Sequence, residues 1–472
     1  MVKKMSLDWS PWSLGKHNHV FVKFAVSLLL MGLAFRLFFS DSISISPVAE
    51  IPLLERTEAP ENTIPVPLLE RTEAPEAMIT VTTPAPETTI PVTTLAPETT
   101  ISVTTPASLA TPEIGDHRPS KEKCDIFTGD WIPNPSGPAY TNETCHVIEG
   151  HQNCMSNGRP DSGYLYWKWN PRGCELPSFS AERFLELMRH KSWAFIGDSI
   201  SRNHVQSLLC ILSKVEKAVE VYHDKEYKSK RWHFPSSNFS LSVIWSPFLV
   251  QAITFEDNNG VATSEIQLYL DKLDKKWTDQ YQSFDYIVIS GGKWFLKTAI
   301  YYENNTIVGC HYCPGKNLTE MGFEYGYRKA LQRVLNFIVT SSQKELVVWR
   351  TSTPDHFENG DWSNGGTCNR TEPFKDGEID MNDVDIVLRN VELEEYAKAV
   401  AALGSDEEMK IKLLDTTRLS LLRPDGHPGP YRYPNPFAGS KGSAVQNDCL
   451  HWCLPGPIDS WNDLVMELVI NS

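Results

Sequence analysis

The chain has 472 residues, of which 59 are acidic and 44 are Lys or Arg, and its formal net charge is −15. This length is enough for one large domain, or for two ordinary ones, together with appended segments. The acidic balance excludes general binding to nucleic acid, because a phosphate backbone attracts basic surfaces. It agrees with a protein that handles neutral substrates.

Residues 20–39 are predominantly apolar, and the stretch is about long enough to cross a bilayer. Its charged residues, Lys23 and Arg36, lie near the ends, where long side chains reach the lipid interface. Lysines precede the stretch and acidic residues follow it, so the positive-inside rule places residues 1–19 in the cytosol. A cleaved signal peptide is the alternative, but the run is long for one and lacks a clear small-residue cleavage site. We expect a signal anchor with type II topology.

Residues 40–123 are rich in Pro, Thr and Glu and almost free of aromatic residues. The sequence Pro-Leu-Leu-Glu-Arg-Thr-Glu-Ala-Pro-Glu begins at Pro52 and again at Pro67, and a Thr- and Pro-rich unit begins at Thr82 and again at Thr93. Such a composition cannot bury enough apolar surface to offset the entropy of the chain. We expect an extended stem, a candidate for O-glycosylation, that holds a folded domain away from a membrane.

All ten cysteines lie beyond the anchor, and their number is even, as a disulfide framework in an oxidising compartment needs. The five sequons for N-glycosylation lie on the same side of the anchor. Together these features indicate the lumen of the secretory pathway. The sequons are at Asn142, Asn238, Asn304, Asn317 and Asn369.

The composition changes sharply at Lys123. Residues 124–178 are rich in Cys, Trp and Gly and show few helical or strand patterns, which predicts a small subdomain held by disulfides. Trp131, Trp167 and Trp169 have flat apolar rings that suit a pyranose, although core packing is the commoner role of such side chains.

Residues 179–472 have the pattern of an α/β domain, in which short apolar β-branched runs alternate with amphipathic helices. Such runs are typical of strands buried on both faces of a parallel sheet. We therefore expect a three-layer α/β/α fold with a mainly parallel sheet, in which ligands bind beyond the carboxyl ends of the strands. The expected strands are 193–196, 285–290, 346–350 and 411–414, and the expected helices are 202–214, 325–341, 391–403 and 459–470.

The turn Gly197-Asp198-Ser199 joins the first of these strands to the first helix. A serine in this position lies near the unpaired N–H groups of a helix N-terminus, where negative charge is favoured. An acyl-transfer intermediate carries such a charge on one oxygen. Ser199 is therefore a candidate nucleophile, and Gly291, after the strand at 285–290, is a candidate backbone donor to the same oxygen. An ordinary turn is the alternative.

A second dense stretch lies near the C-terminus. Asp448 and His451 are three residues apart there, which places them on one side of a helix or turn. A serine hydroxyl needs a base, and a carboxylate fixes the tautomer of a histidine that serves as the base. Ser199, Asp448 and His451 thus make a complete candidate triad.

Three other interpretations remain open for this stretch. Cys449, His451 and Cys453 have a spacing that zinc accepts, although an oxidising lumen argues against zinc. His427, with Asp425 beside it, is an alternative base in a Pro- and Gly-rich loop. The Asp and His three residues apart can also be purely structural.

The Gly-Asp-Ser turn is followed by Arg202 and Asn203, and residues 448–462 read Asp-Cys-Leu-His-Trp-Cys-Leu-Pro-Gly-Pro-Ile-Asp-Ser-Trp-Asn. With these motifs the chain from Cys124 onward resembles the plant trichome birefringence-like family, polysaccharide O-acetyltransferases of the PC-esterase type. The resemblance implies a fold similar to that of SGNH/GDSL esterases, with an N-terminal subdomain that bridges a substrate groove. Further matching motifs are Gln152-Asn153-Cys154, Gly158-Arg159-Pro160-Asp161, Trp169-Asn170-Pro171 and Asp425-Gly426-His427-Pro428-Gly429.

The resemblance implies that Ser199 is the nucleophile, His451 the base and Asp448 its orienting acid. Acetyl then passes from a donor to the serine and from the serine to a sugar hydroxyl. An esterase, which hands the acetyl group to water, is the alternative, and a wall-polysaccharide binder without catalysis is a third. The residues expected around the oxyanion are Gly197, Asp198, Arg202, Asn203 and Gly291, and the candidate substrate contacts are Trp294, Trp452, Trp461 and His427.

The family's disulfides imply four pairs in this chain and leave Cys310 and Cys313 to pair with each other or to remain free. Two of the implied bonds would clamp the segment that holds the candidate base, which gives the flanking cysteines a role other than zinc binding. The implied pairs are Cys124–Cys174, Cys145–Cys210, Cys154–Cys453 and Cys368–Cys449.

Within the family the chain is most similar to the xyloglucan-directed branch, on residues 206–210, residues 245–249 and the Cys310-x-x-Cys313 pair. This implies transfer to a galactose hydroxyl in the side chains of xyloglucan, although xylan and mannan members share the catalytic motifs. We expect no bound cofactor or metal. An acetyl donor is needed, and acetyl-CoA or a donor-supplying membrane protein are candidates. The implied location is the Golgi membrane, with the catalytic domain in the lumen.

Overall fold

The computed structural model describes residues 124–255, 264–341, 346–403, 411–438 and 445–471. The predicted cytosolic tail, signal anchor and stem lie outside these residues. Within the described part of the chain, no helix is both long enough and apolar enough to cross a membrane.

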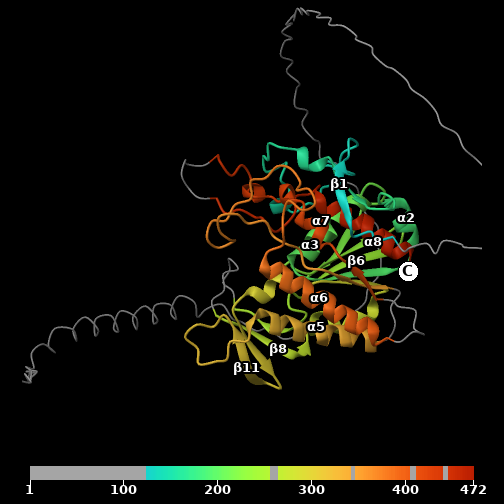
Figure 1. The fold of residues 1–472 in the computed structure, drawn as a ribbon. Coiled ribbons are helices and arrows are strands. Elements are labelled where there is room, and N and C mark those ends of the chain that lie inside the picture. Colours follow the sequence, from blue (N-terminus) through green and yellow to red (C-terminus); the bar gives the residue numbers. More distant parts are fainter. Residues whose placement is uncertain (1–123, 256–263, 342–345, 404–410, 439–444, 472) are drawn as a thin grey trace, which may run out of the picture. The chain divides into compact units, whose positions relative to one another are not determined.

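A seven-stranded sheet forms the centre of the fold (Figure 1). Its strands are β3 (Ser192–Gly197), β4 (Val219–His223), β5 (Lys230–Phe234), β6 (Phe239–Trp245), β9 (Tyr286–Ile289), β12 (Leu346–Arg350) and β13 (Ile411–Leu414). Their order in space is β13-β12-β9-β3-β6-β5-β4. The strands from β13 to β6 are parallel, and β5 and β4 continue the sheet as an antiparallel edge. The expected mainly parallel sheet is confirmed.

Helices cover both faces of this sheet. They are α2 (Ala181–Leu187), α3 (Ser199–Leu212), α4 (Lys275–Thr278), α5 (Gly322–Thr340), α6 (Asp383–Ala401), α7 (Thr417–Leu421) and α8 (Ser460–Ile470). Alternate side chains of β3 belong to two separate cores: Trp193 and Phe195 pack with α3 and α8, whereas Ala194 and Ile196 pack with α5 and α6. Because both faces are buried, β3 and β9 consist mainly of apolar residues. The domain therefore has the expected three layers.

The expected strands and helices are all present, and their starts differ most in the helices. Helix α3 begins at Ser199 and α5 at Gly322, each three residues earlier than expected. Helix α6 begins at Asp383, eight residues earlier, where the Asn382 side chain accepts a hydrogen bond from the Asp385 N–H. Asn is a preferred N-cap residue, so this start had a local signal that the apolar periodicity did not include.

The sequence analysis did not predict strands β4, β5 and β6 of the central sheet, nor the smaller sheets. One has the order β11-β10-β8-β7, and the other is the pair β1–β2. Strand β8 alternates buried and half-buried residues, and its buried Leu268 and Leu270 pack in the same core as α5. A search for continuous apolar runs misses strands that bury only one face. The bounds are β1 (Gly129–Pro133), β2 (Trp167–Pro171), β7 (Val250–Ile253), β8 (Ile266–Leu273), β10 (Ala299–Glu303) and β11 (Thr306–His311).

The tryptophans of the N-terminal subdomain mostly form its core. Trp131 and Trp169 are directly opposite each other in the β1–β2 pair, and their rings meet edge to face at 5.7 Å. The Trp131 indole N–H donates to the Leu419 carbonyl, which ties the subdomain to α7. Both rings are buried, so neither can stack on a sugar, whereas Trp167 is half-buried.

All ten cysteines are paired in five disulfides. Four of them are the pairs that the family resemblance implies, and Cys310 pairs with Cys313. Of the predicted glycosylation sites, Asn142 is half-buried and the other four side chains are exposed. The disulfides are Cys124–Cys174, Cys145–Cys210, Cys154–Cys453, Cys310–Cys313 and Cys368–Cys449.

The order of the parallel strands places a switch point between β3 and β9. The chain builds β6 on one side of β3, and then β9, β12 and β13 on the other. In sheets of this kind the crevice for ligands opens at the carboxyl ends of the strands where the order reverses. Ser199 follows β3, and Gly291 follows β9, so both residues lie at this crevice.

Gly197 makes the close approach between these two strand ends possible. A Cβ atom at this position would lie 2.6 Å from the Ser290 carbonyl oxygen and 2.6 Å from Ser201 Oγ. The Ser290 N–H donates to the Ile196 carbonyl at 3.0 Å, which holds this backbone in place, so a side chain at residue 197 has no room. The Gly of the Gly-Asp-Ser turn is thus required by its packing against Ser290, the residue after β9, and against Ser201.

We expect Gly197→Ala to lower the free energy of unfolding by about 1–3 kcal/mol, because the added methyl group overpacks a rigid site. Urea unfolding measures the change. Gly163→Ala is the matched control, since a Cβ atom there would meet nothing within 4 Å. Equal stability of the two variants would show that the end of β3 has more space than the structure gives it.

Candidate active site

Ser199 is the first residue of α3, and the Asp198 side chain caps this helix by accepting a hydrogen bond from the Ile200 N–H at 3.0 Å. Asp198 and Ile200 are buried, but Ser199 is partly exposed. The helix N-terminus favours negative charge beside the serine. This arrangement suits a nucleophile whose reaction develops an oxyanion.

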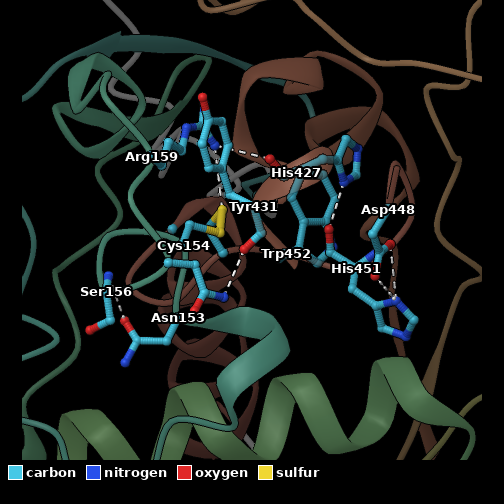
Figure 2. Close-up of a disulfide and its surroundings, with 12 residues drawn as sticks. Asn153, Cys154, Ser156, Arg159, His427, Tyr431, Asp448, His451 and Trp452 are labelled. Carbon is cyan, nitrogen blue, oxygen red and sulfur yellow. Dashed lines mark hydrogen bonds and ion pairs between the residues drawn. A yellow bond between two sulfur atoms is a disulfide. The ribbon is translucent and has the colours of Figure 1, made fainter. Parts of the chain in front are cut away.

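Asp448 and His451 are hydrogen-bonded to each other (Figure 2). The Nδ1–H of His451 donates to Asp448 Oδ2 at 2.9 Å and to Oδ1 at 3.1 Å, and the His451 backbone N–H donates to Oδ1. Burial alone would raise the pKa of the Asp448 carboxyl, but the imidazole and these hydrogen bonds hold that pKa below its ordinary value. Among the described residues, His451 Nε2 has no hydrogen-bond partner. The ring is therefore oriented with one nitrogen available to take a proton.

Asn203 connects the helix of the serine to the loop of the histidine. The Trp452 N–H donates to Asn203 Oδ1 at 2.7 Å, and Asn203 Nδ2 donates to the Trp452 carbonyl at 3.3 Å. Asn203 lies one turn along α3 from Ser199, and Trp452 is next to His451. The amide thus fixes the backbone of the candidate base against the helix of the candidate nucleophile.

Two disulfides hold the same loop from both sides. Cys453 is bonded to Cys154 of the N-terminal subdomain (Figure 2), and Cys449 is bonded to Cys368. The sulfurs that flank His451 are therefore in covalent bonds and cannot act as thiolate ligands to zinc. This removes the metal interpretation of the Cys-x-His-x-Cys spacing.

Two aromatic residues near His451 were not predicted. His151, in the N-terminal subdomain, lies edge to face with the His451 ring at 6.2 Å, and Trp362 lies at 6.4 Å from it. Burial, together with His451 and Arg202 nearby, lowers the pKa of His151 to about 4, although Glu149 opposes this shift. Trp362 is 38% exposed, and the Arg432 guanidinium lies over its ring. Neither residue belongs to a motif, and only the fold brings them beside His451.

Three of the four candidate substrate contacts require correction, because their side chains are buried. Trp452 and Trp461 are 0% and 1% exposed and lie in the core that also contains α3 and α8, so their rings cannot stack on a sugar. His427 is also buried and donates from Nδ1 to the His451 carbonyl, which is a supporting position rather than that of the base. Trp294 is half-buried and lines a small cavity that also contains Trp245.

The residues expected around an oxyanion are not equally placed for that role. Arg202 lies over the Trp245 ring, and its Nε has no partner among the described residues. Gly291 lies at the carboxyl end of β9. Gly197, Asp198 and Asn203 have the structural roles described above: close packing, helix capping and the clamp on Trp452.

The fold and this site define a class of protein. SGNH-like acyl esterases have this combination of features. These features are a three-layer α/β domain, a Gly-Asp-Ser turn after the first parallel strand, and an Asp-x-x-His pair near the C-terminus. The PC-Esterase family, described as a GDSL/SGNH-like acyl-esterase family found in Pmr5 and Cas1p, matches residues 176–468. The PMR5 N-terminal domain matches residues 122–175.

The chain belongs to the trichome birefringence-like proteins, within the PC-esterase family. Protein trichome birefringence-like 25 of Arabidopsis thaliana is 53% identical over 475 residues, which cover 99% of this chain and 97% of the relative. Trichome birefringence-like 26 of the same plant is 60% identical over 368 residues, 78% of this chain and 81% of the relative. Xyloglucan O-acetyltransferase 1 of Arabidopsis thaliana is 44% identical over 358 residues, 76% and 83% of the two chains.

We expect Asn203→Ala to lower the free energy of unfolding by about 1–3 kcal/mol, because it leaves the Trp452 N–H and carbonyl unpaired in a buried place. Thermal and urea unfolding measure the loss. Asn390→Ala, on the exposed face of α6, is the control and should have little effect. If Asn203→Ala were as stable as the wild type, the clamp would not be a determinant of the fold.

Proposed function

We propose that this protein is a polysaccharide O-acetyltransferase that uses Ser199, His451 and Asp448 as a triad, and that its acceptor is cell-wall xyloglucan. The observation that carries the proposal is the Asp448–His451 pair, whose His451 Nε2 has no hydrogen-bond partner in the described part of the chain. Asn203 holds this pair against the helix that begins at Ser199. Acyl transfer through a covalent intermediate requires a serine nucleophile and an oriented base that can take its proton.

In the first step Ser199 Oγ attacks the carbonyl carbon of the donor acetyl group while His451 Nε2 takes the hydroxyl proton. The developing oxyanion faces the N-terminus of α3, and the Arg202 guanidinium and the Gly291 N–H are the further candidate donors. Loss of one such donor typically costs about 3–4 kcal/mol of transition-state stabilisation. The bond from acetyl to the donor breaks, the leaving group takes the proton from His451, and the acetyl group is then an ester of Ser199.

In the second step a sugar hydroxyl gives its proton to His451 and attacks the acetyl ester. Ser199 leaves and recovers the proton, so that the enzyme returns to its first state. Trp362 has the exposure and the position to stack on the acceptor, and the neutral His151 ring can exchange a hydrogen bond with its hydroxyls. A sugar that fills this space excludes the water that would otherwise take the acetyl group.

The proposal for xyloglucan rests on relatives whose names give that activity. They are 43–46% identical to this chain over about three quarters of its length. Four relatives named only as trichome birefringence-like proteins are more similar, at 53–60% identity. Xylan or mannan as acceptor is therefore the first alternative. A polysaccharide acetylesterase is the second, and net loss of acetyl from acetylated polymer without transfer would favour it.

The donor and the location are also proposals. The chain has no glycine-rich phosphate-binding loop, so acetyl-CoA is a candidate without a motif of its own, and a membrane protein that supplies acetyl is the other. The apolar stretch 20–39 and the stem 40–123 suit a type II protein of the Golgi membrane with its catalytic domain in the lumen. No metal is required by the proposed chemistry.

We expect Ser199→Ala to lower acetyl transfer from an activated acetyl ester to a xyloglucan oligosaccharide by at least about a thousandfold, with the fold unchanged. Product mapping by NMR and unfolding curves provide the two readouts. Ser213→Ala, at the other end of α3, is the control and keeps activity. Full activity of folded Ser199→Ala would contradict the proposed nucleophile.

We expect Trp362→Ala to raise the KM for the oligosaccharide acceptor about fivefold or more, because a sugar–indole stack is lost, while hydrolysis of the acetyl ester in the absence of acceptor stays unchanged. Phe437→Ala removes another exposed ring, 68% exposed, and serves as the control. An unchanged acceptor KM in the Trp362 variant would place the acceptor elsewhere.

A further inference from the structure

Behind the His451 loop, two more histidines form a continuous chain of hydrogen bonds. His427 Nδ1 lies 2.7 Å from the His451 carbonyl oxygen (Figure 2), and His356 Nε2 lies 2.8 Å from the Leu421 carbonyl oxygen. A carbonyl only accepts, so each of these nitrogens carries a hydrogen. Rotating either ring by half a turn would replace nitrogen by carbon at both contacts, so the ring orientations are determined.

The remaining nitrogens of the two rings, His356 Nδ1 and His427 Nε2, lie 2.7 Å apart. A neutral imidazole has one N–H, and in each ring that hydrogen already points to a carbonyl. Two neutral rings would therefore bring two lone pairs together at hydrogen-bond distance. The observed contact requires one further proton between them.

We propose that His356 and His427 form a dyad that shares one proton, and that this proton keeps His427 bonded to the carbonyl of His451 and so positions the catalytic base. The proposal rests on the function proposed above, because it takes His451 as the base. His356 and His427 are positioning residues, since they act through the backbone of His451. If the dyad loses its proton, the lone pairs repel, and the contact to His451 or to Leu421 must open.

The surroundings favour a positive charge on the dyad. The Trp452 indole is stacked on His427 with ring centroids 4.3 Å apart and an interplanar angle of 25°, and a cation over an indole face is stabilised. The negative groups that act on the two rings are Asp355, Asp425 and Asp448. Asp425 is paired with Arg423, and Asp355 with Lys293, so their charges are partly compensated.

Other groups oppose the charge and make it sensitive to pH. His356 and His427 are 8% and 4% exposed, and burial lowers the pKa of both rings. Lys293 acts in the same direction on His356, as His451 does on His427. Arg159 of the N-terminal subdomain adds a further cation, since it donates to the His427 carbonyl at 2.9 Å. The dyad therefore holds its proton at low pH and loses it as the pH rises. The plot of activity against pH should then fall on its alkaline side, which we call the alkaline limb.

The variant His356→Asn tests whether the hydrogen bond to His427 is enough, or whether the shared proton itself is needed. An Asn amide nitrogen at the place of Nδ1 donates permanently to neutral His427 Nε2, so no shared proton is needed. In the full-length wild-type protein, kcat should fall on the alkaline limb by up to about tenfold per pH unit, which is the slope expected when one proton is lost. His356→Asn should retain its activity there, and His356→Leu, which offers no donor, should be impaired at every pH. His146→Asn, at an exposed site, is the control.

The shared proton can also be observed without activity. In full-length protein with 15N-labelled histidine, it should give an NMR signal far downfield of ordinary imidazole N–H signals, coupled to two nitrogens and absent from His356→Asn and His356→Leu. The signal and the alkaline limb of kcat should disappear over the same pH range. An alkaline limb unchanged in His356→Asn, or the absence of the signal in folded, active wild type, would overturn the dyad. Ser199→Ala should keep the signal, so failure of the proposed function is distinguished from failure of the dyad.

Discussion

The hydrogen bonds between the Asn203 amide and the backbone of Trp452 join parts of the chain that are 249 residues apart. They attach the loop of His451 to the helix whose first residue is Ser199, and so connect the two halves of the candidate site. Disulfides from Cys154 and Cys368 reach the same loop from two other directions. The candidate base His451 is thus positioned by disulfides at Cys449 and Cys453, on either side of it, and by the buried Asn203 amide, which is bonded to the next residue, Trp452.

The N-terminal subdomain contributes to this frame rather than standing apart from it. Gln152 accepts a hydrogen bond from the Leu454 N–H through its backbone carbonyl, and Arg159 donates to the His427 carbonyl. His151 from the same subdomain stands beside the His451 ring. The subdomain therefore holds the loop of the candidate base, and its His151 lies beside the ring of that base.

Four of the five parallel strands of the central sheet could be predicted from the sequence because each is a short, mainly apolar run. The fifth, β6, was missed although it is buried, because Ser240 and Ser242 interrupt its apolar run. Strands that bury one face, such as β8, escaped because alternation over a few residues is a weak signal. Of the site, Ser199, Asp448 and His451 stand in recognisable motifs. Trp362 could not be predicted from a motif, and Trp452 and Trp461 were misjudged because residue type does not reveal whether a ring faces the core or the groove. The proton between His356 and His427 follows only from geometry.

The claim that Ser199 carries the acetyl group between two partners is tested most directly by isolating the intermediate. Full-length protein is treated with 4-nitrophenyl acetate, quenched in acid, digested, and mapped by mass spectrometry, with and without a xyloglucan oligosaccharide. Our account predicts an acetyl ester on Ser199 that decreases when the oligosaccharide is present, as acetylated oligosaccharide forms. Acetylated product without any acetyl-Ser199, or an acetyl group that accumulates on another side chain and is passed to the sugar, would contradict it.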